Sequence, residues 1–142
     1  MSKRSNRADN PLSHVPIFAG LGAEELDDVR GLLTEVGIDA GTVLVRQGSH
    51  VNEFFVIESG TARVERDGVE IAEVGPGDFQ GEIALLDGGA RTATVTASTA
   101  MTILVATHAE FNGLLDRAPT IARQMLPTLV ARLRAMATDA VD

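Results

Sequence analysis

A succession of short β-type segments separated by turn signals occupies the middle of this 142-residue chain and constrains its fold most. From Val36 onward, stretches rich in β-branched and aromatic residues alternate with turns that contain glycine. The best hairpin signal is Asp67-Gly68, because these residue types tolerate the positive φ angles that two-residue turns need. Short strands at this spacing favour a sandwich, barrel or roll over a parallel α/β sheet. We expect strands at Thr42–Val45, Glu53–Glu58, Thr61–Glu65, Val69–Val74, Arg91–Ala97 and Met101–Ala106.

Helical patterns flank these segments on both sides. Residues 11–34 are expected to be helical, with Leu26, Val29 and Leu33 on one face and acidic residues in the first turn. After residue 106, Thr107 and Glu110 have the spacing of a capping box, which predicts the start of a second helix.

A last helix is expected to begin at Ala118-Pro119, because proline fits the first helical position. Its apolar stripe is interrupted by Pro127, which removes a backbone hydrogen bond, so we expect a kink near residues 123–127. We expect fraying from about residue 137. The stripe consists of Ile121, Met125, Leu129 and Leu133.

Composition and charge exclude several classes of protein. The chain is 44% apolar and 23% charged, which is ordinary for a globular domain. No apolar run is long enough for a transmembrane helix, and the basic N-terminal residues are not followed by the apolar stretch of a secretory signal. The chain has no Cys, so a cytoplasmic location is the default. A formal net charge of −8 argues against binding to nucleic acid, and any anionic ligand would need a local positive site.

One segment, Gly81–Leu86, lacks the alternation of a strand and predicts a short helix inserted between strands. It follows a glycine-rich entry, and Gly81 has no Cβ to keep a ligand from the backbone. The unpaired N–H groups at a helix start favour an anion, and Arg91 would add a permanent positive charge. Glu82 would repel an anion unless it accepts a hydrogen bond from a neighbouring hydroxyl. Together these residues describe a site for one phosphate and an adjacent ribose hydroxyl.

At these residues the chain resembles the cyclic-nucleotide-binding domain family. The resemblance is carried by Gly81–Leu86, a gap of four residues and Arg91–Val95, which look like the phosphate-binding cassette of that family. It extends over nearly residues 14–135, where Pro16–Leu21, Gly41–Gly48 and Phe54–Gly60 also resemble family segments. The family implies a fold that is mainly β with flanking helices: a jelly-roll-like β-roll, an N-terminal helix, a short phosphate-binding helix and two C-terminal helices.

The resemblance also implies roles for individual residues. Arg91 would pair with the cyclic phosphate, and Glu82 would accept a hydrogen bond from the ribose 2′-hydroxyl. Backbone N–H groups of Ile83, Ala84 and Thr92 would complete the phosphate cage, with Gly81 near the ribose. Thr92 does not settle the base, since a hydroxyl residue stands here in both cGMP-selective and cAMP-binding members of the family.

The chain departs from the family pattern in two respects. Gln80 stands where an apolar or aromatic residue often precedes the Gly-Glu pair, and the C-terminal helix has no Tyr or Trp to stack on a base. Candidates for a base lid are therefore Leu129, Arg132 and Leu133, with Arg134 or a second subunit as alternatives.

Three functional hypotheses are open at this point. The first is a non-enzymatic, cytoplasmic binding domain for cAMP, or less favourably cGMP, in which the ligand shifts the C-terminal helices and no further cofactor is used. The second is a scaffold with the same fold that binds no nucleotide, as Gln80 and the missing aromatic cap suggest. The third is a metal enzyme of the cupin type, disfavoured because His14, His50 and His108 lie far apart.

The expected domain organisation is a flexible leader at 1–12, a cyclic-nucleotide-binding domain at 13–137 and a frayed tail at 138–142. Expected partners are a cyclic nucleotide and either a second copy of the chain or an effector protein in trans, with no nucleic acid and no membrane. The chain would be either free-standing or a regulatory fragment of a larger protein.

Overall fold

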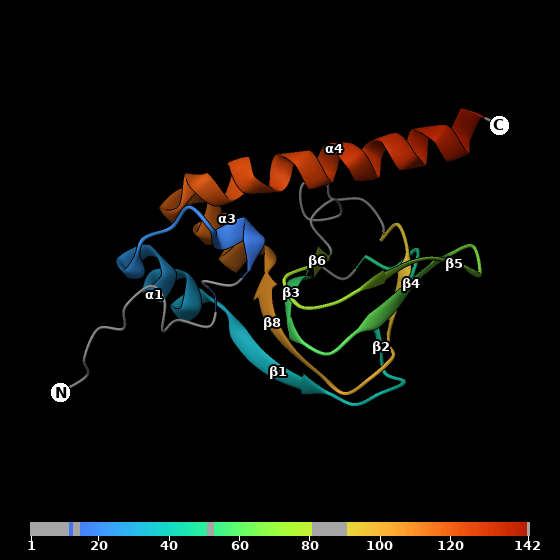
Figure 1. Ribbon diagram of the computed structural model, residues 1–142, viewed down its shortest axis with the longest axis horizontal. Helices are drawn as coiled ribbons and strands as arrows, with labels where there is room; N and C mark the ends of the chain where they lie inside the picture. The colour runs from blue at the N-terminus through green and yellow to red at the C-terminus, as the bar shows by residue number, and fades with distance from the viewer. Residues whose placement is uncertain (1–11, 13–14, 51–52, 81–90, 142) are drawn as a thin grey trace.

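The computed structural model describes residues 12, 15–50, 53–80 and 91–141. Two four-stranded antiparallel sheets form a roll, and the helices gather on one side of it (Figure 1). One sheet has the strand order β1-β8-β3-β6 and the other β2-β7-β4-β5. The strands are β1 (Thr34–Ile38), β2 (Val43–Val45), β3 (Glu53–Ser59), β4 (Ala62–Arg66), β5 (Val69–Val74), β6 (Phe79–Gln80), β7 (Thr94–Ala97) and β8 (Met101–Thr107). The helices are the 3₁₀ turn η3 (Pro16–Phe18), α1 (Ala23–Leu32), α3 (His108–Arg117) and α4 (Pro119–Val141).

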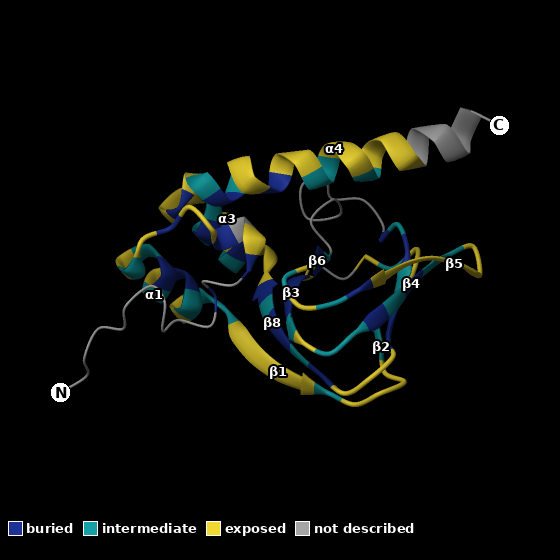
Figure 2. Cartoon of the chain, in the orientation of Figure 1, coloured by how far each residue is buried: buried dark blue, intermediate teal, exposed yellow. Residues whose placement is uncertain are grey.

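The paired strands β3 and β8 separate two hydrophobic cores. Successive residues of a strand point to opposite faces, so Phe54 and Val56 pack with the helices while Phe55 and Ile57 pack inside the roll. Both faces are covered, which is why four consecutive residues of β3 are buried (Figure 2). Which side chains of β3 and β8 enter the roll interior therefore depends on the register of this pair.

The helical core is organised around an aromatic cluster. The ring of Phe54 lies 4.7 Å from that of Phe111 and 6.0 Å from that of Phe79, centroid to centroid. The predicted capping box at the start of α3 is confirmed: the Glu110 N–H donates to Thr107 Oγ1, and the Thr107 N–H donates to Glu110 Oε1. α4 begins at Pro119, as the proline predicted.

The turn at Asp67-Gly68 is confirmed as the hairpin between β4 and β5. Both residues have positive φ angles, +55° for Asp67 and +80° for Gly68. Two hydrogen bonds connect this turn to Gln47, which follows β2 in the chain. Gln47 Nε2 donates to Asp67 Oδ1 at 2.9 Å, and Gln47 Oε1 accepts from the Asp67 N–H at 2.8 Å. The hairpin is thereby tied to the segment that follows β2.

The prediction of helix over residues 11–34 is wrong in its extent. The chain forms the turn η3 and then α1, which begins after Gly22 because that residue is extended, with φ −78° and ψ 174°. Leu26 and Val29 are buried as expected, but Leu33 is extended and Thr34 already belongs to β1. β1 was not expected because four of its five residues are exposed. β6 was missed as well, since a strand of two residues carries no periodicity.

α4 runs along one side of the molecule as a single helix that includes Pro127 (Figure 1). It extends to Val141, so the helix reaches into the part of the chain where we expected a frayed tail. The predicted domain boundaries are not otherwise tested. No helix within the described residues is long and apolar enough to span a membrane.

Candidate functional site

Arg91 is held in place by the turn that follows β2, the neighbour of β7 in the sheet. Its N–H donates to the Ser49 carbonyl at 2.8 Å, and its own carbonyl accepts from the Gly48 N–H at 2.9 Å. Gly48 has φ +85°, a conformation that favours glycine. The expected strand over Arg91–Ala97 therefore begins only at Thr94, because the backbone of Arg91 bonds to this turn rather than to a neighbouring strand.

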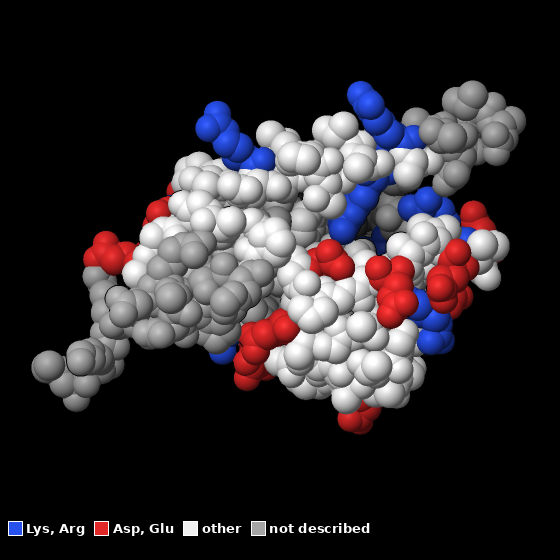
Figure 3. Space-filling model, in the orientation of Figure 1, with Lys and Arg blue, Asp and Glu red and all other residues white. Residues whose placement is uncertain are grey.

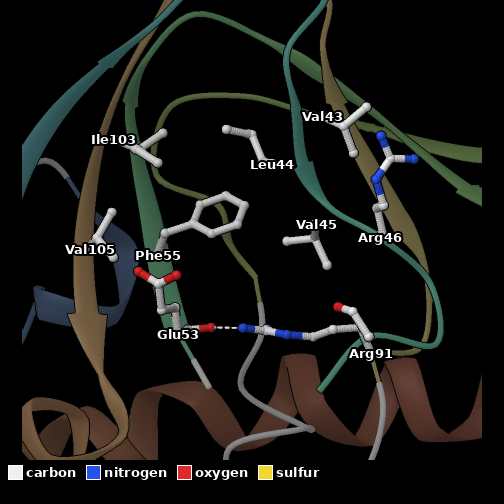
Figure 4. Close-up of a pocket in the computed structure, with 10 residues that line it drawn as sticks. Val43, Leu44, Val45, Arg46, Glu53, Phe55, Arg91, Ile103 and Val105 are labelled. Carbon is white, nitrogen blue, oxygen red and sulfur yellow. Dashed lines mark hydrogen bonds between the residues drawn. The ribbon is translucent and has the colours of Figure 1, made fainter. Parts of the chain in front are cut away.

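The side chain of Arg91 points into the roll. It is 4% exposed, and its Nη2 donates a hydrogen bond to the backbone carbonyl of Glu53 at the start of β3 (Figure 4). Ala93 and Val95 point into the roll core. Backbone bonds at one end and the Glu53 carbonyl at the other fix the position of the guanidinium group.

Arg91 lines a cavity of about 220 Å³ inside the roll. β2, β3 and β8 supply most of its wall, and Figure 4 shows the apolar side chains of Leu44, Val45 and Phe55 directed toward its centre. Polar groups are few, as is usual for a small-molecule site in which a few polar contacts orient the ligand. The lining residues are Val43, Leu44, Val45, Arg46, Ser49, Glu53, Phe55, Arg91, Ile103 and Val105.

The electrostatics of the cavity differ from those of the whole chain. Among the described lining residues Arg91 and the exposed Arg46 are the cations, and Glu53 is the one acidic residue. The chain as a whole has a formal net charge of −8. A buried guanidinium in low-dielectric surroundings attracts an anion more strongly than a solvated one. The cavity thus fits a small ligand with an apolar body and one anionic group.

Four predicted ligand residues, Gly81, Glu82, Ile83 and Ala84, lie outside the described residues, as does the predicted short helix at 81–86. Thr92 is described and half-buried, and its carbonyl accepts a hydrogen bond from Arg66 Nε at 3.2 Å. Thr92 is not among the residues that line the cavity. Its role as a ligand contact stays a prediction.

The three candidates for a base lid lie on α4 in different environments. Leu129 is partly buried against the helical core, and Leu133 is 54% exposed. Arg132 reaches β6: its Nη2 donates to the Phe79 carbonyl at 2.8 Å, and its Cζ lies 4.8 Å from the centroid of the Phe79 ring. Arg132 therefore connects α4 to the strand that leads into segment 81–90.

Sequence reasoning missed most of the cavity wall. The alternating pattern of the sequence indicates strands, but it does not indicate which face of a strand lines a cavity. Cavity residues that the sequence identified only as parts of strands include Val43, Val45, Phe55 and Ile103. The polar contact Glu53 was missed because it acts through its backbone. The described residues contain no group of three His, Asp or Glu that could hold a metal ion.

Comparison with known proteins identifies the family. The family model of the cyclic nucleotide-binding domain matches residues 35–118, more than half of the chain, so the chain belongs to this family. A cAMP-dependent protein kinase regulatory subunit from Yarrowia lipolytica is 35% identical over 71% of this chain. That match spans 28% of the relative, so the chain corresponds to a minor part of the whole protein.

Solved structures give the same result for the fold. The catabolite activator protein of Thermus thermophilus superposes with a TM-score of 0.78 at 29% identity, over 88% of this chain and 61% of that one. PKAR CBD2 bound to Sp-2Cl-cAMPS superposes with a TM-score of 0.78 at 25% identity, over 93% and 92%. The chain is a regulatory cyclic-nucleotide-binding domain with the β-roll and flanking helices expected from its sequence.

Proposed function

We propose that this domain is a sensor that binds cAMP in preference to cGMP and signals through α4. Arg91 would hold the cyclic phosphate together with the N–H groups of Ile83, Ala84 and Thr92. Glu82 would accept a hydrogen bond from the ribose 2′-hydroxyl, close to Gly81. The base would occupy the apolar part of the roll cavity.

The burial of Arg91 carries this proposal. An arginine is rarely buried in a protein core unless something nearby uses its charge. Arg91 is 4% exposed and lines an apolar cavity in an acidic chain. A phosphate matches the guanidinium in charge and can accept two parallel hydrogen bonds from it.

The preference for cAMP is supported by the relatives rather than by a base contact. The matched kinase regulatory subunit is named for its dependence on cAMP, and the matched PKAR CBD2 domain holds a cAMP analogue. Titration calorimetry with each nucleotide tests the preference directly. Tighter binding of cGMP would contradict it without contradicting the site.

Signalling through α4 is supported by the contact of Arg132 with Phe79. Phe79 and Gln80 form β6, which pairs with β3 and immediately precedes segment 81–90. A ligand held by Arg91 would act on this segment. If the contact between Arg132 and Phe79 is stronger in the ligand-free state than in the bound state, or the reverse, ligand binding shifts the position of α4.

Calorimetry of Arg91→Ala tests the site. Removing a charged partner from a buried phosphate contact should weaken cAMP binding by at least about 2 kcal/mol, roughly 30-fold. Arg63→Ala is the matched control, because Arg63 is a surface residue paired with Glu65 at 2.9 Å. Equal affinities for Arg91→Ala and the wild type would refute the assignment.

The absence of native cysteine makes the helix movement directly measurable. Spin labels on Ala131→Cys in α4 and Glu70→Cys in β5 report the distance between the helix and the roll, since both positions are exposed. Saturating cAMP should shift this distance and leave a control pair at Asp39→Cys and Glu70→Cys unchanged. Identical distances with and without cAMP, for a protein that binds it, would rule out signalling through α4.

The second candidate function is a scaffold that keeps the fold and binds no nucleotide. It is favoured by one observation: the chain contains no Tyr and no Trp that could cap a base. A wild-type protein that gives no binding heat with either nucleotide, while remaining folded, would support the scaffold and exclude the sensor.

A further inference from the structure

The exposed side of α4 carries a ridge of large apolar residues. Leu126 is 55% exposed, Val130 48% and Leu133 54%. At 3.6 residues per turn these three side chains fall within about 60° of one another around the helix. Ile121 and Met125, which are buried, lie at least about 80° around the helix from each ridge residue and hold α4 against the helical core. The ridge is therefore not the face that α4 needs for its own folding.

The charges that α4 itself contributes beside the ridge are all of one sign. Between Pro119 and Ala135 the sequence contains three arginines and no acidic residue, although the chain as a whole has a formal charge of −8. Arg123 and Arg134 are exposed and lie near the same side of the helix as Val130. Basic side chains project outward from α4, whereas acidic ones dominate the visible surface of the roll (Figure 3). The ridge is thus a cationic strip on an acidic molecule.

This charge pattern selects among the partners that an apolar ridge can take. A second copy packed α4 against α4 would bring Arg123 and Arg134 of both copies to one seam, to which the stretch from Pro119 to Ala135 contributes no acidic residue, and this is unfavourable. An anionic bilayer would attract the strip but repel the acidic body that accompanies it. A single acidic helix from a partner protein would contact the strip without approaching the acidic roll. Its apolar residues would pack on the ridge, and its acidic residues would attract the arginines.

We infer that the strip Arg123, Leu126, Val130, Leu133 and Arg134 is a docking site for an acidic amphipathic helix of a partner protein. Apolar residues at i, i+4 and i+7 of that helix would pack along the ridge, and Asp or Glu beside them would face the two arginines. The inference does not depend on nucleotide binding, because its test substitutes Leu126, which neither lines the roll cavity nor is a candidate for the base lid.

Fluorescence anisotropy with two synthetic helical peptides tests this inference. Both peptides carry the same leucine stripe; one has Glu beside the stripe and the other has Lys. The Glu peptide should bind the wild-type chain, with an affinity that falls as salt is raised, and the Lys peptide should bind at least about tenfold more weakly. Leu126→Glu should reduce binding of the Glu peptide by about tenfold or more.

Ala135→Glu is the matched control, since it adds the same charge to an exposed position on the side of α4 opposite the ridge. It should leave the affinity for the Glu peptide within about threefold of the wild type, because it removes no contact of the strip. Equal binding of the two peptides, or equal effects of the two substitutions, would overturn the inference.

Two further outcomes would also overturn it. Sedimentation equilibrium that shows a dimer, lost in Leu126→Glu, would assign the ridge to a second copy. Binding to vesicles of phosphatidylcholine and phosphatidylserine in equal parts, measured by co-sedimentation and lost in Leu126→Glu, would assign the ridge to a membrane. Each result leaves the calorimetry of the nucleotide site unaffected, so the two proposals can fail separately.

Discussion

The contact of Arg132 with Phe79 leads to a quantitative prediction about how α4 is held. Arg132 Nη2 donates to the Phe79 carbonyl at 2.8 Å, and the guanidinium lies over the Phe79 ring at 4.8 Å. A hydrogen bond from a charged donor contributes about 1.5–3 kcal/mol, and partial exposure places this one at the lower end. A cation–π contact near the surface adds about 0.5–1 kcal/mol. Arg132→Met retains the packing of the aliphatic stem, so it should lower the free energy of unfolding by about 2 kcal/mol.

The two contributions can be separated with a double-mutant cycle. Phe79→Leu removes the aromatic ring and leaves the carbonyl, so Arg132→Met in that background should lose only the hydrogen bond. The coupling energy between the two positions should then equal the cation–π contribution, about 0.5–1 kcal/mol. Urea unfolding followed by circular dichroism at 222 nm measures all four variants, since the chain has no Trp for fluorescence.

Arg123→Met is the control for this cycle, because Arg123 lies on the same helix and is exposed. Its effect should stay within about 0.5 kcal/mol of zero. The interpretation fails if Arg132→Met costs no more than Arg123→Met. It also fails if Arg132→Met has the same effect with and without the Phe79 ring.

Three further predictions concern the folding of the roll and the helical core. Gly60 and Gly68 both have positive φ, but a Cβ at Gly60 would lie 2.4 Å from the Ala100 carbonyl oxygen, whereas a Cβ at Gly68 would meet nothing within 4 Å. Gly68→Ala should cost about 1 kcal/mol, and Gly60→Ala should lower the melting temperature far more. Similar melting temperatures for the two variants would contradict this. Thr107→Ala removes the cap of α3 and should reduce stability by about 1 kcal/mol in urea unfolding; an unchanged midpoint would argue against the cap. Phe111→Ala should cost about 3–5 kcal/mol because its ring is 1% exposed, and a loss below about 1 kcal/mol would mean that this core collapses freely.

Local sequence chemistry was enough to predict much of the secondary structure. Asp67 and Gly68 are residue types that accept positive φ angles, and they predicted the hairpin. The spacing of Thr107 and Glu110, whose side chains each accept a hydrogen bond from the other's N–H, predicted the start of α3. These signals act between residues close in the chain, so they can be read without knowing the fold. The residues Arg91–Val95 were also recognisable from type and spacing, and the buried position of Arg91 agrees with the positive site expected there.

Contacts between distant parts of the chain could not be predicted in this way. β1 was not expected because its residues are mostly exposed, and only Thr34 fell within the expected helix; the segment becomes a strand by pairing with β8, with Thr34 opposite Val105. The contact between Arg132 and Phe79 joins residues 53 positions apart, and no local pattern signals it.

The division of β3 between two cores shows the physical limit most clearly. Phe54 and Phe55 are adjacent and chemically identical, yet one stacks in the helical core and the other lines the roll cavity. A shift of one residue in strand register would exchange them. The sequence thus specifies which side chains are buried, whereas the pairing of β3 with β8 assigns each to a core. The residues of the cavity wall follow from that pairing, because a site built from several strands exists only after the strands have met.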